Sequence, residues 1–164
     1  MRRLNRFKVG KTNPLWRMYE TISFFKVVRN FIVIEIGRYA PSTRVKYFLY
    51  THFLGMKLGR HVSLAYKAMP DLMYPEKIFI GNNSIIGYNT VILTHEYLVD
   101  EYRVGEVRIG ANTMIGANVT ILPGVTIGDN VTVGAGSVVS KDIPDNTVSY
   151  PHPLMMRSRS NEQQ

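Results

Sequence analysis

The chain has 164 residues, of which 45% are hydrophobic, enough apolar material for one folded domain. It has no cysteine, so a disulfide framework, a thiolate zinc site and a cysteine nucleophile are excluded. Its net charge of +8 is uneven: residues 1–67 hold fourteen Lys and Arg against two Glu, whereas residues 68–164 hold six against ten acids. The first part is therefore expected to face something anionic, whether a phosphate ligand, a lipid surface or a nucleic acid.

The sequence gives no indication of an export signal or a membrane-spanning helix. The basic N-terminus is not followed by an apolar run with a small-residue cleavage site. The most apolar segment, residues 31–36, is short and lies among the charges of Arg29, Glu35 and Arg38. We therefore expect a cytoplasmic protein.

Residues 1–56 predict a basic helical extension. An Asn-Pro pair at 13–14 is typical of a helix start, and apolar residues then recur at helical spacing to about Tyr39. After a proline break, Ser42 can cap a second helix, and Gly55 closes it.

From residue 80 onward an aliphatic residue recurs every six positions, which is an internal repeat. These residues are Ile80, Ile86, Ile92, Ile109, Ile115, Ile121, Ile127, Val133 and Val139. Three places after most of them stands a residue type that tolerates positive φ: Asn83, Asn89, Asn112, Asn118, Gly124, Asn130 and Gly136.

Each unit of six therefore predicts a short strand followed by a tight corner. Flat sides of this length close only by coiling, so the repeat predicts a parallel β-solenoid over residues 57–149, with a polar tail over 150–164. General crossover rules favour a right-handed coil, and nothing in the spacing contradicts them.

The segment IGANVTILPGVTIGDNVTVGAGSVVSKDIP, residues 115–144, resembles the hexapeptide-repeat acyltransferases, nearest to the maltose, galactoside and xenobiotic O-acetyltransferase group. The resemblance covers about residues 57–148, and the helical segment before it is similar to the N-terminal extension of some sugar acetyltransferases. It implies a mainly β fold, a left-handed parallel β-helix, and a homotrimer. It also implies acetyl-CoA as cosubstrate, bound between neighbouring subunits, with a sugar hydroxyl as the first expected acceptor.

The repeat is broken once, by a loop over residues 96–106 that is rich in charges and aromatics. His95 fills the corner slot directly before it and matches the catalytic histidine of the family. A neutral imidazole can take the acceptor's hydroxyl proton and later return it to the CoA thiolate. Glu96 either orients the ring or is a solvated loop carboxylate. The alternative for His95 is that it is only a polar corner residue without a catalytic role.

The resemblance also implies a site for CoA and its acceptor. Ala117 matches the position whose backbone N–H helps to hold the thioester, and Ala135 the residue whose backbone meets pantetheine. Ser140 and Lys141 match residues near the phosphates of CoA, where a cation suits the negative charge. Asp71 falls near the place where relatives contact the acceptor.

One departure from the family pattern follows the last coil. Relatives usually carry Gly-Asn-Pro-Ala there, packed over CoA, whereas this chain has Pro151-His-Pro-Leu154. The departure predicts an altered lid or a changed affinity for CoA.

The sequence also bears on functions other than acetyl transfer. A carbonic anhydrase on this fold needs three histidines around zinc, and His95 has no histidine partner within the repeats, so no metal is expected. An inactive scaffold is the main alternative to an enzyme. The basic first third carries no nucleic-acid motif. Its interleaved cations and aromatics favour contact with an anionic membrane, unless these helices simply pack on the solenoid.

Overall fold

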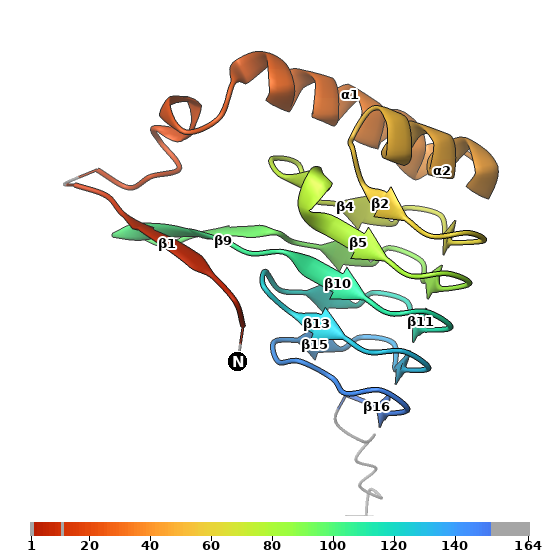
Figure 1. The fold of residues 1–164 in the computed structure, drawn as a ribbon. Coiled ribbons are helices and arrows are strands. Elements are labelled where there is room, and N and C mark those ends of the chain that lie inside the picture. The colour runs from red at the N-terminus through yellow and green to blue at the C-terminus, as the bar shows by residue number, and fades with distance from the viewer. Residues whose placement is uncertain (1, 11, 152–164) are drawn as a thin grey trace, which may run out of the picture.

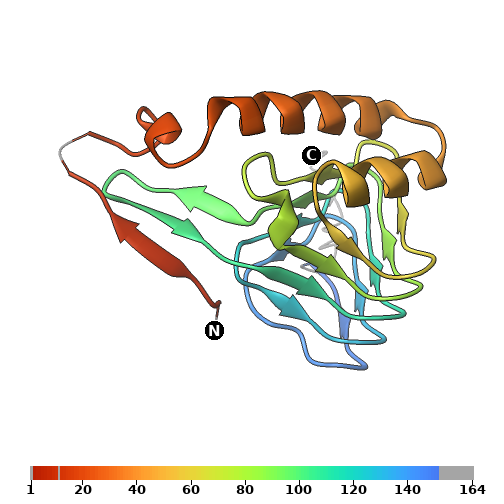
Figure 2. The same ribbon diagram turned by 45° about the horizontal axis from the view of Figure 1, so that its top comes forward.

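The computed structural model describes residues 2–10 and 12–151. Stacked coils form a three-sided prism, and two helices lie across the end where the first coils begin (Figures 1 and 2). No helix in these ranges is long and apolar enough to cross a membrane. Most of the expected tail, residues 152–164, and with it most of the Pro151–Leu154 departure, lies outside the described residues.

Each side of the prism is a parallel sheet with strands from successive coils. The first sheet contains β2 (Lys57–Leu58), β5 (Ile78–Ile80), β10 (Val107–Ile109) and β13 (Thr126–Ile127). The second contains β3 (Ser63–Leu64), β6 (Ile85–Ile86), β11 (Met114–Ile115), β14 (Thr132–Val133) and β16 (Val148–Ser149). The third contains β4 (Met69–Pro70), β7 (Val91–Ile92), β12 (Thr120–Ile121) and β15 (Val138–Val139).

The period of six sets the register and fills the core. Ile109 pairs with Ile127, three repeats further along, and Ile115 pairs with Val133 in the same way. All the aliphatic residues of the predicted repeat are at most 5% exposed. Burying such side chains contributes about 1.5–3 kcal/mol each before the entropic cost of ordering them, so this column is the main source of stability.

The predicted corners are confirmed. All seven Asn and Gly residues of the repeat have φ between 51° and 78°. Asparagine also links the coils, because the amide of Asn83 donates to Asn112 and that of Asn89 donates to Asn118, each at 2.9 Å. An asparagine corner therefore provides both the backbone conformation and a contact to the next coil.

The predicted loop is an antiparallel hairpin. It consists of β8 (His95–Tyr97) and β9 (Glu101–Val104), which extend away from the prism (Figure 1). His95 differs here from the sequence expectation, because it is not among the described residues with positive φ. It begins a strand at the point where the other repeats turn a corner.

A third strand on this hairpin is absent from the sequence prediction. β1 (Asn5–Lys8) pairs with β9 in antiparallel register, and the rings of Phe7 and Tyr102 stack with centroids 4.7 Å apart. The predicted helical extension thus begins with a strand. Four consecutive exposed residues show no alternation of apolar and polar side chains, and the partner lies far along the chain, so local patterning gives no signal.

The helices are α1 (Phe24–Tyr39) and α2 (Thr43–His52), with 3₁₀ turns η1 (Met18–Glu20) and η2 (Pro75–Lys77). The second helix and its glycine stop are confirmed, since Gly55 has φ of 70°. The first begins at Phe24, not near residue 14. The capping signal is used in an isolated turn instead, where Asn13 Oδ1 accepts the N–H of Trp16 at 3.0 Å.

The helices hold the first coils in place through buried polar contacts. Asn30 on α1 is fully buried, and its Nδ2 donates to the carbonyl of Leu72 at 2.8 Å. Lys46 on α2 donates to the carbonyl of Ala65 at 2.8 Å, and burial lowers the pKa of its ammonium group. The contact at Leu72 places α1 behind the segment that carries Asp71.

Candidate active site

The site is centred on a hydrogen bond between two coils. β4 pairs with β7 so that Pro70 lies opposite Ile92, which brings the residues that follow these strands together. His95 Nδ1 lies 2.6 Å from Asp71 Oδ2. The Asp71 side chain is completely buried, whereas that of His95 is 18% exposed. A buried acid therefore holds an imidazole that reaches the surface.

The carboxylate of Asp71 also accepts four backbone hydrogen bonds. Met73 and Tyr74 donate to Oδ1, and Thr94 and His95 donate to Oδ2, at 2.7–3.2 Å. Burial by itself raises the pKa of this carboxyl, but the hydrogen bond and charge of His95, together with the backbone donors, hold it below its usual value. The group is therefore ionised at neutral pH.

These contacts change the role expected for Asp71. The sequence places it near the acceptor, but both of its oxygens are engaged inside the protein and its side chain has no exposed surface. The structure therefore assigns Asp71 to the histidine of its own chain, as the group that fixes the ring.

The pairing defines which ring nitrogen of His95 is available. An ionised carboxylate only accepts hydrogen bonds, so Nδ1 of the neutral imidazole carries the proton. Nε2 is then the unprotonated nitrogen, able to accept a proton from a substrate. Asp71 both selects this tautomer and stabilises the imidazolium that forms when Nε2 is protonated.

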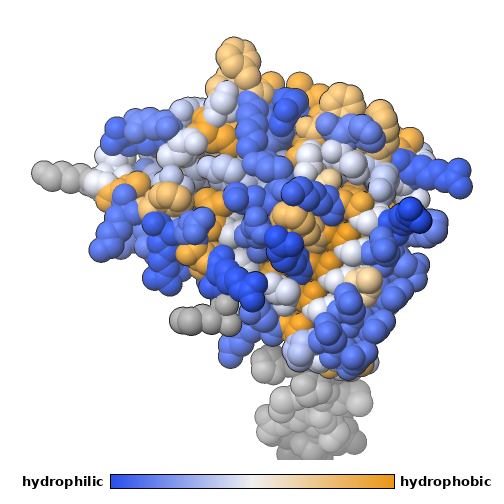
Figure 3. Space-filling view, viewed as in Figure 1, coloured by the Kyte–Doolittle hydropathy of each residue, from blue (hydrophilic) through white to orange (hydrophobic). Residues whose placement is uncertain are grey.

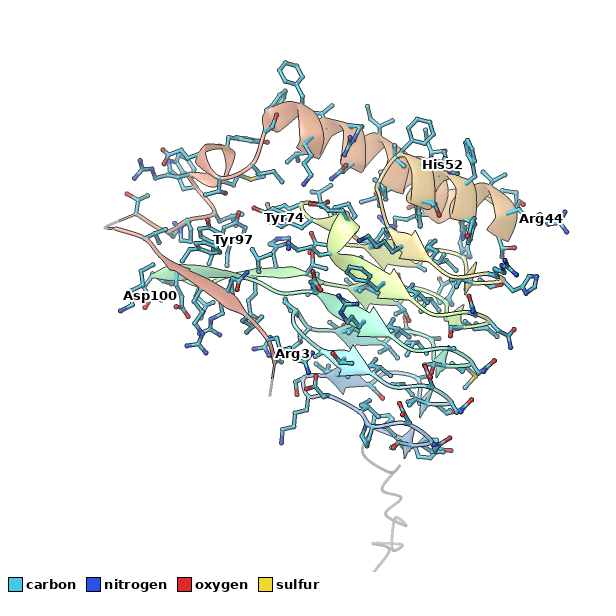
Figure 4. All side chains as sticks on the ribbon, viewed as in Figure 1. Arg3, Arg44, His52, Tyr74, Tyr97 and Asp100 are labelled. Atoms are coloured by element: carbon cyan, nitrogen blue, oxygen red, sulfur yellow. The ribbon has the colours of Figure 1, made fainter. Side chains whose placement is uncertain are left out.

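Aromatic rings enclose the histidine. The rings of Tyr74 and Tyr97 meet that of His95 edge-on, with centroids 6.3 and 5.4 Å away. Figure 4 shows the two tyrosines where the hairpin leaves the prism. Burial raises the pKa of both phenols, so they remain neutral. Thr94 is also buried, and its hydroxyl donates to the Tyr74 carbonyl at 2.9 Å. This bond ties the backbone of Tyr74 to the residue that precedes His95.

Glu96 does not orient the ring in the way considered from the sequence. Its carboxylate lies 2.9 Å from Arg2 Nη1 and 3.0 Å from Arg103 Nη1. Burial raises the pKa of this carboxyl, but the two arginines outweigh that effect and lower it. Glu96 therefore connects the N-terminal segment before β1 to the hairpin, and the acid that contacts the ring is Asp71.

The predicted CoA residues lie on two different edges of the prism. The histidine edge joins the third sheet to the first and contains residues 71–77, 93–106, 122–125 and 140–142. The alanine edge joins the second sheet to the third and contains residues 65–68, 87–90, 116–119 and 134–137. Ser140 and Lys141 share the histidine edge with His95, whereas Ala117 and Ala135 lie across the third sheet. A side of about six residues, at about 3.3 Å each, separates the two groups.

Two hollows meet at Ser140 and Lys141. One of about 700 Å³ lies at the C-terminal end of the prism and is also lined by Tyr150. The other, of about 590 Å³, lies between these residues and the N-terminal segment, from which Arg2, Leu4 and Arg6 form the opposite wall. Alternate residues of an extended segment share one face, so Arg2 and Arg6 both line the same hollow as Lys141. Asp142 also lines it, and Arg2 is paired with Glu96.

Within the ranges that the structure describes, no cluster of three His, Asp or Glu side chains is arranged to hold a metal ion.

Comparisons with known proteins bear on this fold and site. Residues 106–141 match the family described as Bacterial transferase hexapeptide (six repeats). YvoF of Bacillus subtilis (strain 168), provisionally named an acetyltransferase, is 52% identical over 100% of this chain and 95% of its own length. SAS0727 of Staphylococcus aureus (strain MSSA476), with the same provisional name, is 57% identical over 89% of this chain and 91% of its own.

Solved structures show the same architecture. A galactoside acetyltransferase in complex with coenzyme A is 26% identical, with a TM-score of 0.59, over 77% of this chain and 76% of its own. A maltose O-acetyltransferase from Clostridium difficile 630 is 25% identical, with a TM-score of 0.56, over 85% and 90%. The chain belongs to the hexapeptide-repeat acetyltransferases. Its prism is a left-handed parallel β-helix, so the right-handed coil favoured by general crossover rules is wrong.

Sequence reasoning missed the partner of His95 and the residues around it. The signal was the register: if Pro70 pairs with Ile92, then Asp71 lies one coil away from the segment that leads to His95. The irregular coil after Pro70 concealed that register, because it does not follow the period of six.

Asp71 gives a pH-dependent contribution to stability. A carboxyl whose pKa is lowered on folding stabilises the protein above its unfolded-state value of about 3.9, and this contribution is lost as the pH falls through the folded-state value. Asp71→Asn is therefore expected to reduce the free energy of unfolding near neutral pH by about 1–3 kcal/mol. Urea unfolding at a series of pH values should show this difference shrinking below about pH 4.

The matched control is Asp129→Asn, which alters an exposed corner carboxylate that accepts the N–H of Ala111 at 2.6 Å. Its effect is expected to stay within about 0.5 kcal/mol. A deficit in Asp71→Asn that stays constant down to acid pH would contradict the role of the ionised carboxylate.

Proposed function

We propose that this protein transfers an acetyl group from acetyl-CoA to a hydroxyl of a small acceptor, a sugar in the first instance, with His95 as the general base. The observation that carries the proposal is the 2.6 Å contact between His95 Nδ1 and the buried Asp71, which leaves Nε2 as an acceptor at the surface. The galactoside and maltose acetyltransferases among the similar structures support an acceptor of the sugar class.

The chemistry follows from the tautomer of His95. Nε2 removes the proton of the acceptor hydroxyl as its oxygen attacks the thioester carbon, and the carbon–sulfur bond then breaks. The proton on Nε2 passes to the departing CoA thiolate, so the imidazole ends neutral. Asp71 stabilises the imidazolium between these steps, and the backbone N–H of Ala117 is the proposed donor to the carbonyl oxygen of the thioester.

A homotrimer would complete the site. In one chain, His95 lies on the histidine edge while Ala117 and Ala135 lie on the alanine edge, a full side of the prism away. Packing of the histidine edge of one subunit against the alanine edge of the next would bring both groups to one cleft. Such a head-to-tail contact closes into a ring, as a cyclic trimer requires.

We propose that the phosphates of CoA bind in the hollow between Lys141 and the N-terminal segment, which we call the basic hollow. Lys141 and Arg6 line it from opposite walls, and Ser140 adds a hydroxyl. Guanidinium and ammonium groups form charge-assisted hydrogen bonds to phosphate. The N-terminal strand would therefore contribute to binding the cosubstrate.

An inactive scaffold with this fold is the alternative. It would not need a buried carboxylate that desolvation penalises and that five donors must stabilise. In a melting assay, a scaffold would show no shift with acetyl-CoA, whereas a binder at 100 times its Kd gains about 2.7 kcal/mol.

His95→Ala is expected to reduce kcat by about 10²–10⁴-fold, because general base catalysis contributes an effect of that size. Thiol release from acetyl-CoA with a panel of sugars measures turnover, and the melting shift with acetyl-CoA is expected to persist. His61→Asn is the control: His61 is an exposed corner residue with φ of 60°, which asparagine tolerates. Near wild-type turnover in His95→Ala would refute the base assignment.

Arg6→Gln and Lys141→Gln are each expected to raise KM for acetyl-CoA about ten-fold, the effect of losing about 1.4 kcal/mol of phosphate binding. With S-acetylpantetheine, which has no phosphates, KM is expected to stay unchanged. Arg17→Gln is the charge-matched control, because Arg17 pairs with Glu20 at an exposed site, outside the basic hollow. A similar rise in KM for both thioesters would mean that the hollow does not bind phosphate.

Mixed trimers test whether two subunits build one site. His95→Ala removes the base, and Ala135→Trp blocks the opposite edge, so each variant alone is expected to be inactive. Co-expressed subunits form trimers at random, in which roughly one site in four combines an intact histidine edge with an intact alanine edge. A recovery of about a quarter of wild-type turnover is expected. No recovery, with a mass of three 18.7-kDa chains confirmed by sedimentation, would place the site within one subunit.

A further inference from the structure

Helix α1 is apolar on two opposite sides. Its inner side carries the buried residues Val27, Asn30, Val33, Ile34 and Gly37. Its outer side carries large hydrophobic residues that are 38–82% exposed: Phe24, Phe25, Val28, Phe31, Ile32 and Ile36. At 100° per residue, the centres of these two sets lie about 180° apart on the helix. A helix that only packed on the β-helix would carry polar residues on its outer side.

The exposed apolar surface extends beyond α1. Val45, Phe48 and Phe53 continue it along α2, and the preceding segment adds Trp16, which is 83% exposed, and Tyr19. Rings connect the parts, with centroids 5.3 Å apart for Tyr19 and Phe24 and 5.9 Å apart for Phe24 and Phe25. We call the exposed hydrophobic residues between positions 16 and 53 the outer helical face. Figure 3 shows apolar atoms gathered along the helical end of the molecule.

Cations border the outer helical face. Arg29 and Arg38 follow the two sides of the apolar stripe on α1, and the exposed Arg44 stands at the start of α2. Arg38 is paired with Glu35 of the same helix at 2.8 Å. Residues 12–53 contain six Lys and Arg against two Glu. Three of these cations are ion-paired and Lys46 is buried, so Arg29 and Arg44 are the cations that the outer helical face presents. The Arg29 guanidinium donates to the amide oxygen of Asn30, a neutral partner that leaves its charge uncompensated.

We propose that the outer helical face docks on the surface of an anionic lipid bilayer. Helices α1 and α2 would lie in the plane of the interface, with their aromatic side chains among the headgroups and upper acyl chains and their arginines next to lipid phosphates. The charge argues against a second copy of the chain as the occupant, because two faces that are each bordered by cations would repel. This proposal does not depend on acetyl transfer.

Docking can be measured by flotation with phosphatidylcholine vesicles, with and without about 30% phosphatidylglycerol. The wild-type protein is expected to float with the anionic vesicles and to detach as salt is raised. Phe25→Ser with Phe31→Ser is expected to weaken this binding at least about ten-fold, and Arg29→Gln with Arg44→Gln to abolish the preference for anionic vesicles. Both pairs lie on exposed positions, so melting temperature and thiol release are expected to match wild type.

Val99→Ser is the matched control, because Val99 is 82% exposed like Phe25 but lies on the hairpin. It is expected to float like wild type. The proposal is overturned if the wild-type protein does not float with anionic vesicles at low salt, or if the double phenylalanine variant floats as well as wild type. A mass of more than three chains that falls to three in the phenylalanine variant would also overturn it, in favour of a second copy.

Discussion

The whole structure depends on a corner that recurs at a constant interval. Asparagine or glycine with positive φ turns the chain at seven corners of the predicted repeat, so that aliphatic side chains from successive coils stack in one buried column. The coil cannot absorb an insertion within a strand without moving every side chain out of register. Extra residues must therefore leave the prism at a corner, and both irregular insertions, residues 71–77 and 93–106, do so at the same edge.

That shared edge explains how a regular fold holds a reactive group. Asp71 comes from one insertion and His95 from the next, and the sheet register between them sets their separation. Four backbone N–H groups donate to the Asp71 carboxylate, and its one side-chain hydrogen bond is to the imidazole of His95. The rings of two tyrosines lie edge-on to the imidazole, and its other nitrogen stays available.

The N-terminal segment serves the β-helix from two sides. Its helices cap the first coils, and Asn30 fixes the backbone behind Asp71. Its strand covers the hairpin, where Arg2 holds Glu96, and the same segment brings Arg6 to the hollow beside Lys141. The outer side of α1 contributes nothing to this packing, which is why we infer a partner for it.

The sequence alone determined the coil, its corners, the buried column, the second helix and the position of the break at His95, because each of these is a local or periodic signal. The left-handed winding of the β-helix was predicted from the family resemblance and not from the spacing of the repeat. Only the tertiary structure decided the pairing of Asp71 with His95, the strand at residues 5–8, the true start of α1 and the separation of the two edges. These features depend on how insertions of unequal length stack across coils. Contacts between residues that are distant in sequence leave no periodic pattern from which they could be predicted. The physical reason is that a repeat specifies contacts between equivalent positions of successive coils, whereas Asp71 and His95 lie in insertions that have no equivalent in the other coils.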